Sequence, residues 1–204
     1  MEQNQEFSPM QSLELISRTL DNSRKDIVRG GAKYYILWGI LLTVMSLAVY
    51  FLWKGTGNPS WNFLWFAMPV IGYPIAAMLK NKSGKVLPSN FVTELNGKVW
   101  TAFCIFSTSI AALSILLHLL TKSTASALMV NGITPSIALL FGICECISGI
   151  ALKNWAIMVG GFLIGVGGTL VFYATGMGIG QMLIFTVAGV ILTLTGVIIK
   201  LQNK

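Results

Sequence analysis

The sequence predicts an all-α integral membrane protein, a bundle of six transmembrane helices preceded by one amphipathic helix. Of its 204 residues, 54% are hydrophobic and only 10% are charged, whereas an ordinary soluble domain carries roughly 25% charged residues. No Asp, Glu, Lys, Arg or His occurs between Asn154 and Ile199, and a stretch of that length fits only in lipid. The composition therefore excludes a soluble globular protein.

Residues 1–33 are expected to form a separate segment built around an amphipathic helix. Ser8, Pro9 and Gln11 have the pattern of a helix start, with a capping serine, a proline in the first turn and a glutamine that reaches back to the cap. Apolar residues then follow at helical intervals. They are Leu13, Ile16, Leu20 and Ile27. Glycines at positions 30 and 31 are expected to let the chain turn into the first span.

This apolar stripe could be covered by the cytoplasmic face of the bundle itself, by a helix of another molecule, or by the lipid surface. Residues 1–33 contain five acidic and five basic residues. A helix without an excess of positive charge is drawn only weakly to anionic lipid. We therefore expect Leu13 and Leu20 to be buried against protein, either the bundle or a cytoplasmic partner.

Six apolar segments have the length of about 20 residues that a helix needs to cross about 30 Å of hydrocarbon. They are residues 34–53, 61–79, 99–120, 130–152, 155–173 and 182–199. The second contains Pro69 and Pro74, which should kink it. The transmembrane domain is expected to cover residues 34–200 and to be followed by a cytoplasmic tail, residues 201–204.

Lysine and arginine are divided unequally between the two ends of these spans. Twelve lie in residues 1–33, around the loop between the second and third spans, and after the fourth and sixth spans, whereas only Lys54 and Lys122 lie on the other side. Because positively charged loops stay in the cytoplasm, both termini are predicted to be cytoplasmic. We expect a multi-pass protein of the inner (plasma) membrane, with the lipid bilayer around it.

Glycine recurs at a spacing of seven in the fourth and sixth spans. Gly142 and Gly149 have the same spacing as Gly189 and Gly196, and each pair is followed four residues later by a lysine, a faint internal repeat. Glycines seven apart return to one helix face, where they allow a neighbouring backbone to approach. The pattern suits packing within one chain and a homo-oligomer contact equally well, and both stay open.

Glu145 is the only acidic residue within a span, about 12 Å of helix rise from Lys153. A charged carboxylate at mid-helix costs about 2.5–3.5 kcal/mol or more. No Lys or Arg lies at a comparable depth, which favours a protonated acid hydrogen-bonded to Ser, Thr or backbone. A proton or cation relay is the alternative. In the repeat the equivalent position is Leu192, so the architecture itself does not require an acid.

The sequence offers no pattern typical of an enzyme, a cofactor or a metal site. Cys144 and Cys146 flank Glu145, but residues two apart on a helix point about 200° away from each other and cannot share an ion. His118, the sole histidine, is predicted near the outer end of the third span, too far from Glu145 for a catalytic pair. Because membrane topology accounts for the net charge of +7, no nucleic-acid partner is expected either.

Several short motifs occur in an order that resembles a known family. They are the Ser8-Pro9 helix start, Arg29-Gly-Gly, Tyr-Tyr-Ile-Leu-Trp38-Gly39, the Gly72-Tyr-Pro74 bend and the Gly149-Ile-Ala-Leu-Lys153 hairpin. Together they resemble an uncharacterised family of small bacterial inner-membrane proteins with several spans. The resemblance implies a signalling or envelope role, with no assigned activity and no functional residues to transfer, and Glu145 is outside its pattern.

The sequence as a whole favours a non-enzymatic interaction or regulatory component whose cytoplasmic helix contacts the bundle or a protein partner. This expectation depends on the stripe that begins at Leu13. The alternative is a small transporter or proton-coupled permease, which depends on Glu145 and on the bend at Pro69 and Pro74. The two hypotheses differ in whether Glu145 faces a water-filled cavity.

Overall fold

The computed structural model describes residues 8–83, 91–175 and 179–202, which are helical almost throughout and contain no strand. The elements follow in the order α1 (Pro9–Thr56), the 3₁₀ helix η1 (Pro59–Phe66), α2 (Ala67–Ser83), α3 (Phe91–Thr121), α4 (Thr124–Asn131), α5 (Ile133–Ala151), α6 (Trp155–Thr175), the 3₁₀ helix η2 (Ile179–Gln181) and α7 (Met182–Gln202). Six helical segments among them are long and apolar enough to cross a membrane, as in a multi-pass membrane protein. The predicted all-α bundle is confirmed.

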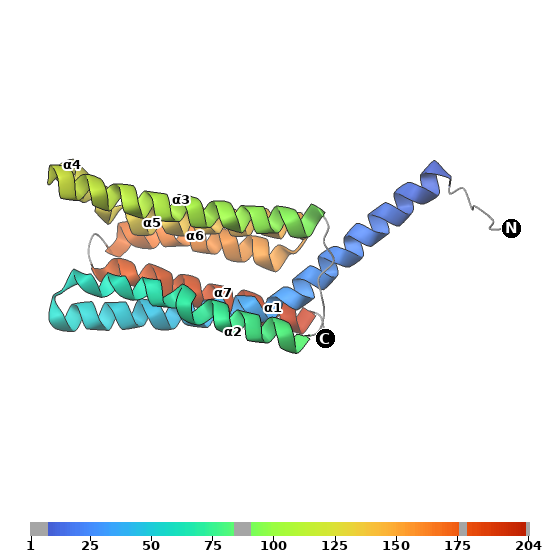
Figure 1. Ribbon diagram of the computed structural model, residues 1–204, viewed down its shortest axis with the longest axis horizontal. Coiled ribbons are helices and arrows are strands. Elements are labelled where there is room, and N and C mark those ends of the chain that lie inside the picture. The colour runs from blue at the N-terminus through green and yellow to red at the C-terminus, as the bar shows by residue number, and fades with distance from the viewer. Residues whose placement is uncertain (1–7, 84–90, 176–178, 203–204) are drawn as a thin grey trace.

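Helix α1 is longer than predicted, because its 48 residues include both the amphipathic helix and the first span. The predicted capping box is confirmed: the Gln11 N–H donates to Ser8 Oγ at 3.3 Å, and the Ser8 N–H donates to Gln11 Oε1 at 3.0 Å. The helix changes direction where it leaves the bundle (Figure 1), but it is not interrupted at residues 30 and 31.

The predicted break between two helices at this glycine pair is therefore wrong, because α1 changes direction as one continuous helix. Val28 and Ala32, on either side of the pair, are both buried in one apolar cluster. Packing on both sides holds the helix together and outweighs the cost of about 1 kcal/mol that each glycine adds relative to alanine.

Two of the predicted spans begin differently from expectation. The second starts as η1, and α2 begins only at Ala67. Pro69 lies in the first turn of α2 and cannot donate to the carbonyl of Trp65, which explains this boundary, and Pro74 lies within the helix. The fourth span is divided between α4 and α5 at Gly132, three residues before Pro135, which likewise has no N–H to donate.

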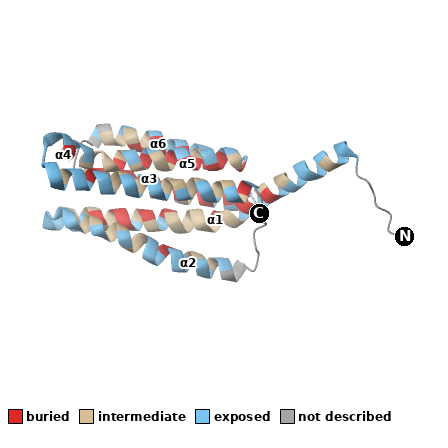
Figure 2. Cartoon of the chain, turned by 45° about the horizontal axis from the view of Figure 1, so that its top comes forward, coloured by how far each residue is buried: buried red, intermediate tan, exposed pale blue. Residues whose placement is uncertain are grey.

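The bundle has two layers of helices (Figure 1). One contains α1, α2 and α7, and the other contains α3, α5 and α6. The N-terminal part of α1 extends beyond the bundle at the end where the C-terminus also lies. Residues of α2 and α3 are mostly exposed (Figure 2), since only 6% of the apolar stretch of each is buried within the protein. We expect these two helices to face lipid.

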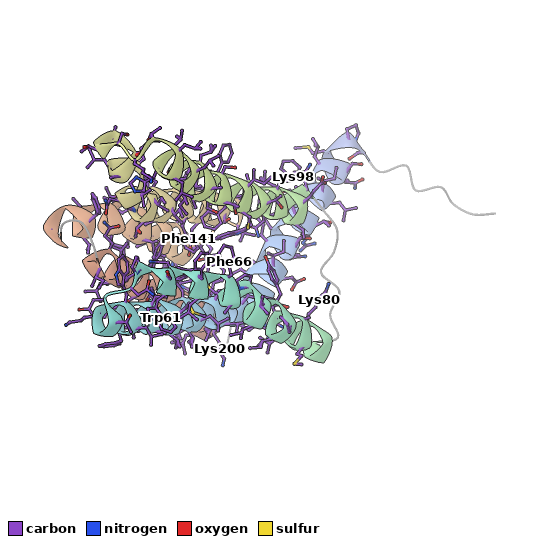
Figure 3. The ribbon with its side chains drawn as sticks, turned by 60° about the vertical axis from the view of Figure 1, so that its left-hand side comes forward. Trp61, Phe66, Lys80, Lys98, Phe141 and Lys200 are labelled. Atoms are coloured by element: carbon purple, nitrogen blue, oxygen red, sulfur yellow. The ribbon has the colours of Figure 1, made fainter. Side chains whose placement is uncertain are left out.

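Basic side chains mark the end of the bundle from which α1 projects. Figure 3 shows Lys80 and Lys98 towards this end and Trp61 towards the opposite one. The turn that contains Lys153 and the end of α7 lie at the base of the projecting part of α1. We refer to this end as the predicted cytoplasmic end.

The two closest helix pairs, α1 with α7 and α5 with α6, pack through glycine. A Cβ atom added at Gly189 would lie 2.7 Å from the backbone oxygen of Gly39 and 2.7 Å from the backbone nitrogen of Thr43. A Cβ atom added at Gly142 would lie 2.5 Å from the backbone oxygen of Gly161. These glycines therefore serve packing within the chain, which is the first of the two possibilities left open by the sequence. A homo-oligomer contact stays a prediction.

Candidate functional site

The apolar stripe of α1 is exposed at its tip and buried at its base. Leu13 is 68% exposed and Ile16 is 56% exposed, Leu20 is half-buried, and Ile27 is only 8% exposed. Leu13 is not buried against the bundle, because α1 continues outward beyond the bundle instead of turning back onto it (Figure 2), and its burial against a cytoplasmic partner stays a prediction. We call residues 9–20 the tip of α1.

Polar contacts attach α1 to the bundle just below this tip. Asp21 accepts hydrogen bonds from Arg24 Nη1 at 2.9 Å and from Lys153 Nζ at 3.1 Å. Arg24 Nε also donates to the carbonyl of Ala151 at 3.1 Å. The hydrogen bond from Lys153, followed by that from Arg24, lowers the pKa of the Asp21 carboxyl below its ordinary value. Asp21 therefore joins α1 to the turn between α5 and α6.

A cavity of about 350 Å³ lies beside this attachment. Its polar wall includes Lys25, Asn154 and Gln202, and its apolar wall consists of Val28 and Leu152. The cavity thus lies between the base of α1, the turn after α5 and the end of α7, at the predicted cytoplasmic end.

Glu145 lies in the interior of the bundle and has no exposed surface. Ser148, on the next turn of α5, is buried to the same extent. Among the described residues, neither of the two carboxyl oxygens of Glu145 has a hydrogen-bond partner. The Ser148 hydroxyl has no hydrogen-bond partner among them either. The expected hydrogen bonds from Glu145 to Ser, Thr or backbone are absent among the described residues, because the carboxyl faces a glycine of α6.

Three other helices contribute to the surroundings of Glu145. A Cβ atom added at Gly160 of α6 would lie 3.5 Å from Glu145 Oε1 and 2.5 Å from Thr195 Oγ1 of α7. A Cβ atom at Gly161 would lie 2.9 Å from Glu145 Cβ, so the backbone of α6 packs directly against the acid. Tyr35 of α1 packs against the hydrophobic clusters on both sides of this site. The carboxyl group is therefore enclosed by glycine backbone and by hydroxyl-bearing residues.

Apolar layers lie on both sides of this polar cluster. The layer towards the predicted cytoplasmic end, which we call the inner layer, consists of Ile27, Val28, Ala32, Val92, Leu152, Ile157 and Ile199. The layer on the other side, the outer layer, consists of Leu42, Ile164, Ala188 and Leu192. Val28 and Leu152 belong both to the inner layer and to the cavity wall. The base of the stripe, Ile27, therefore lies in the inner layer below Glu145, whereas its tip lies far away.

The remaining candidate groups lie apart from this site or carry no ligand geometry. His118, at the end of α3, has its Nδ1 3.1 Å from Ser126 Oγ of α4. The Cys146 thiol donates to the carbonyl of Met158 at 3.2 Å. Within residues 8–83, 91–175 and 179–202, no group of three or more His, Cys, Asp or Glu side chains could hold a metal ion.

Sequence reasoning found Glu145 but missed the residues around it. Ser148 could have been found from helical spacing, because it follows Glu145 by three positions on the same face. Thr195 and Tyr35 gave no such signal, since their helices can meet α5 only in the folded bundle.

Comparison with known proteins gave no match to a family model, to a curated protein or to a solved structure. The resemblance to the bacterial multispanning family therefore stays a prediction from sequence.

Proposed function

We propose that this chain is a multi-pass inner-membrane protein with cytoplasmic termini, and that it acts as an interaction or regulatory component. In this proposal the tip of α1 docks into an apolar groove of a cytoplasmic protein. The observation that carries the proposal is the exposure of Leu13 and Ile16 on a helix that leaves the bundle.

The pattern of the tip supports a protein partner. Leu13, Ile16 and Leu20 stand at positions i, i+3 and i+7, the anchors by which an amphipathic helix binds in a groove. The same face of α1 is buried by the bundle at Ser23 and Ile27. A partner seated on the tip would therefore continue the apolar core of the protein beyond the attachment at Asp21.

The charge of the tip of α1 favours a protein over lipid as its binding partner. Residues 9–28 contain three acidic and three basic side chains, so the tip and its base carry no net positive charge that anionic lipid would attract. Glu14 and Arg18, one helical turn apart, lie outside the apolar stripe and remain available at the rim of a groove.

Photo-crosslinking tests this proposal with a matched pair of positions. A photoreactive residue is placed at Leu13 or Ile16, and the control is placed at Leu15, which is similarly exposed at 54% but lies about 200° around the helix from Leu13. We expect an adduct that contains a second, different polypeptide from the two stripe positions and not from the control. The substitution Leu13→Asp should abolish the adduct formed at position 16.

Three outcomes would contradict the docking proposal. An adduct of two copies of this chain would make the tip a self-association element, and an adduct with lipid would place it on the membrane. A Leu13→Asp protein with a lower thermal unfolding temperature in detergent would mean that the tip packs on the bundle, because a residue that is 68% exposed should be replaceable without loss of stability.

Proton-coupled transport through Glu145 is the second candidate. The burial of a carboxyl group that has no hydrogen-bond partner in the described part of the chain favours it, because ionisable residues within membrane spans commonly mark ion pathways. The test is flux driven by a pH gradient in proteoliposomes. Loss of such flux in a folded Glu145→Gln protein would support transport, and absence of flux in the wild type would contradict it.

A further inference from the structure

We propose that Glu145 is a proton-binding site that exchanges its proton with the predicted cytoplasmic side, through the inner layer and the cavity beside Asp21. This inference concerns proton binding alone. It depends neither on docking of a partner at the tip of α1 nor on the transport of any solute.

Glu145 carries a proton in the folded protein. The side chain has no exposed surface and no hydrogen-bond partner among the described residues, and none of the ion pairs between described residues includes it. An unpaired charge in such surroundings is strongly unfavourable, whereas a protonated carboxyl is tolerated.

The groups that face Glu145 fit a proton better than a metal cation. The titratable groups on the adjoining elements are Tyr35 on α1 and Cys146 on α5, whose thiol donates to the carbonyl of Met158, while α6 faces Glu145 with Gly160 and α7 with Thr195. Hard metal cations take about six oxygen ligands, and this cluster has one carboxyl group. The backbone of α6 also packs too closely to admit even a Cβ atom beside Glu145. A proton needs neither the ligands nor the space.

The path for the proton runs along α5 from Glu145 to the cavity. Glu145, Ser148 and Leu152 stand at positions i, i+3 and i+7, so all three lie on one face of the α5 chain segment. The Ser148 hydroxyl, which has no hydrogen-bond partner among the residues that the structure describes, lies about 4.5 Å of helix rise closer to the cavity than Glu145 does. Leu152 in the cavity wall is about 10.5 Å of helix rise from Glu145. Only the inner layer separates this polar pair from the cavity. Towards the other end, α5 continues for about 18 Å to Ile133.

Helix α1 itself closes the path between Glu145 and the cavity. Ile27 and Val28 are part of the inner layer and follow the attachment point Asp21 by less than two helical turns. A small displacement of this part of α1 would open the inner layer and let water reach Ser148 and then Glu145. Proton exchange should therefore respond to substitutions in the inner layer.

Infrared spectroscopy of the purified full-length protein tests both parts of the proposal. The chain has seven acidic residues, and Glu145 is the one that lies within a span. The part of the carboxylic-acid C=O band at neutral pH that Glu145→Gln removes therefore reports Glu145. We expect this part of the band in the wild type and not in Glu145→Gln, and we expect it to shift slowly when the protein is transferred to D₂O.

Matched substitutions in the two layers test the route. Leu152→Ala weakens the inner layer, and Leu192→Ala makes the same change at an equally buried leucine of the outer layer, with exposures of 5% and 4%. We expect Leu152→Ala to accelerate the isotope shift by about tenfold, because removing a buried leucine side chain typically costs more free energy of packing than a tenfold change in rate represents. We expect Leu192→Ala to leave the rate of the isotope shift near that of the wild type. Val28→Ala is a milder second variant of the inner layer.

The outcomes that overturn the proposal are distinct. A wild-type protein without the acid band at neutral pH carries an ionised Glu145, and a band that disappears on addition of Na⁺ indicates a metal-cation site. Equal acceleration by Leu152→Ala and Leu192→Ala, or no isotope shift in any variant, would refute the route through the inner layer. None of these results depends on crosslinking at the tip of α1.

Discussion

The contact between α1 and α7 makes a quantitative prediction about Gly189. A Cβ atom at this position would lie 2.7 Å from two backbone atoms of α1, the oxygen of Gly39 and the nitrogen of Thr43, whereas ordinary contact begins at 3.4 Å. Backbone atoms cannot move aside as a side chain can. Gly189→Ala therefore requires α1 and α7 to separate by about 0.7 Å, the difference between these two distances.

The energetic cost follows from this separation. A gap of roughly 0.5–1 Å forfeits a quarter to a half of the dispersion energy of the atoms that line it, and overpacking of a core costs about 1–3 kcal/mol. The higher helix propensity of alanine returns about 1 kcal/mol. We expect Gly189→Ala to be less stable than the wild type by up to about 2 kcal/mol.

Gly167 provides the matched control, because it lies within α6 and, apart from the adjoining backbone of its own helix, no heavy atom lies within 4 Å of a Cβ added there. Gly167→Ala should be as stable as the wild type or more stable by up to about 1 kcal/mol. Reversible unfolding in mixed detergent micelles measures both variants. Equal stability of the two variants would refute the argument that the Gly189 backbone contact holds α1 against α7.

Three further predictions concern orientation, the attachment of α3 and the attachment of α1. Reporter fusions after Lys204 should report cytoplasm and fusions at Gly57 should report the outside, as the distribution of basic residues requires; the reverse would refute the predicted topology. Trp100 of α3 and Phe141 of α5 meet edge to face at 5.3 Å, so a double-mutant cycle with alanine should give a coupling energy of about 0.5–1.5 kcal/mol, and zero coupling would contradict the contact. The attachment through Asp21, whose pKa lies below the ordinary value of 3.8, should persist above that value and be lost as the pH falls through the lowered pKa. Asp21→Asn should accelerate proteolysis of the tip at neutral pH as well, and an unchanged rate would argue against the attachment.

The helices could be predicted from the sequence because a membrane span has a strong local signal. About 20 apolar residues with charged flanks identified six segments, and the capping box at Ser8 marked the first residue of α1. The course of α1 at residues 30 and 31 could not be predicted, because two glycines are a local signal for a turn. Burial of Val28 and Ala32, which no local pattern reveals, decided that the helix continues.

The candidate site was predictable only in part for a related reason. The depth of Glu145 follows from its distance to Lys153 along one helix, and the structure places it in the core. Its neighbours on α1, α6 and α7 depend on how each helix is rotated about its axis. Helix α6 is apolar around its whole circumference, so its sequence does not indicate that Gly160 faces Glu145.

The most direct test of the account is the distance between the tip of α1 and the far end of the same helix. Spin labels at Ile16 and Leu52, in a protein whose three native cysteines are replaced, are separated by 36 residues of continuous helix. Pulsed electron paramagnetic resonance should give a distance between about 40 and 54 Å, the upper value for a straight helix and the lower for a right-angle bend. A distance well below about 40 Å would mean that the chain turns back onto the bundle and that the tip is not available to a partner.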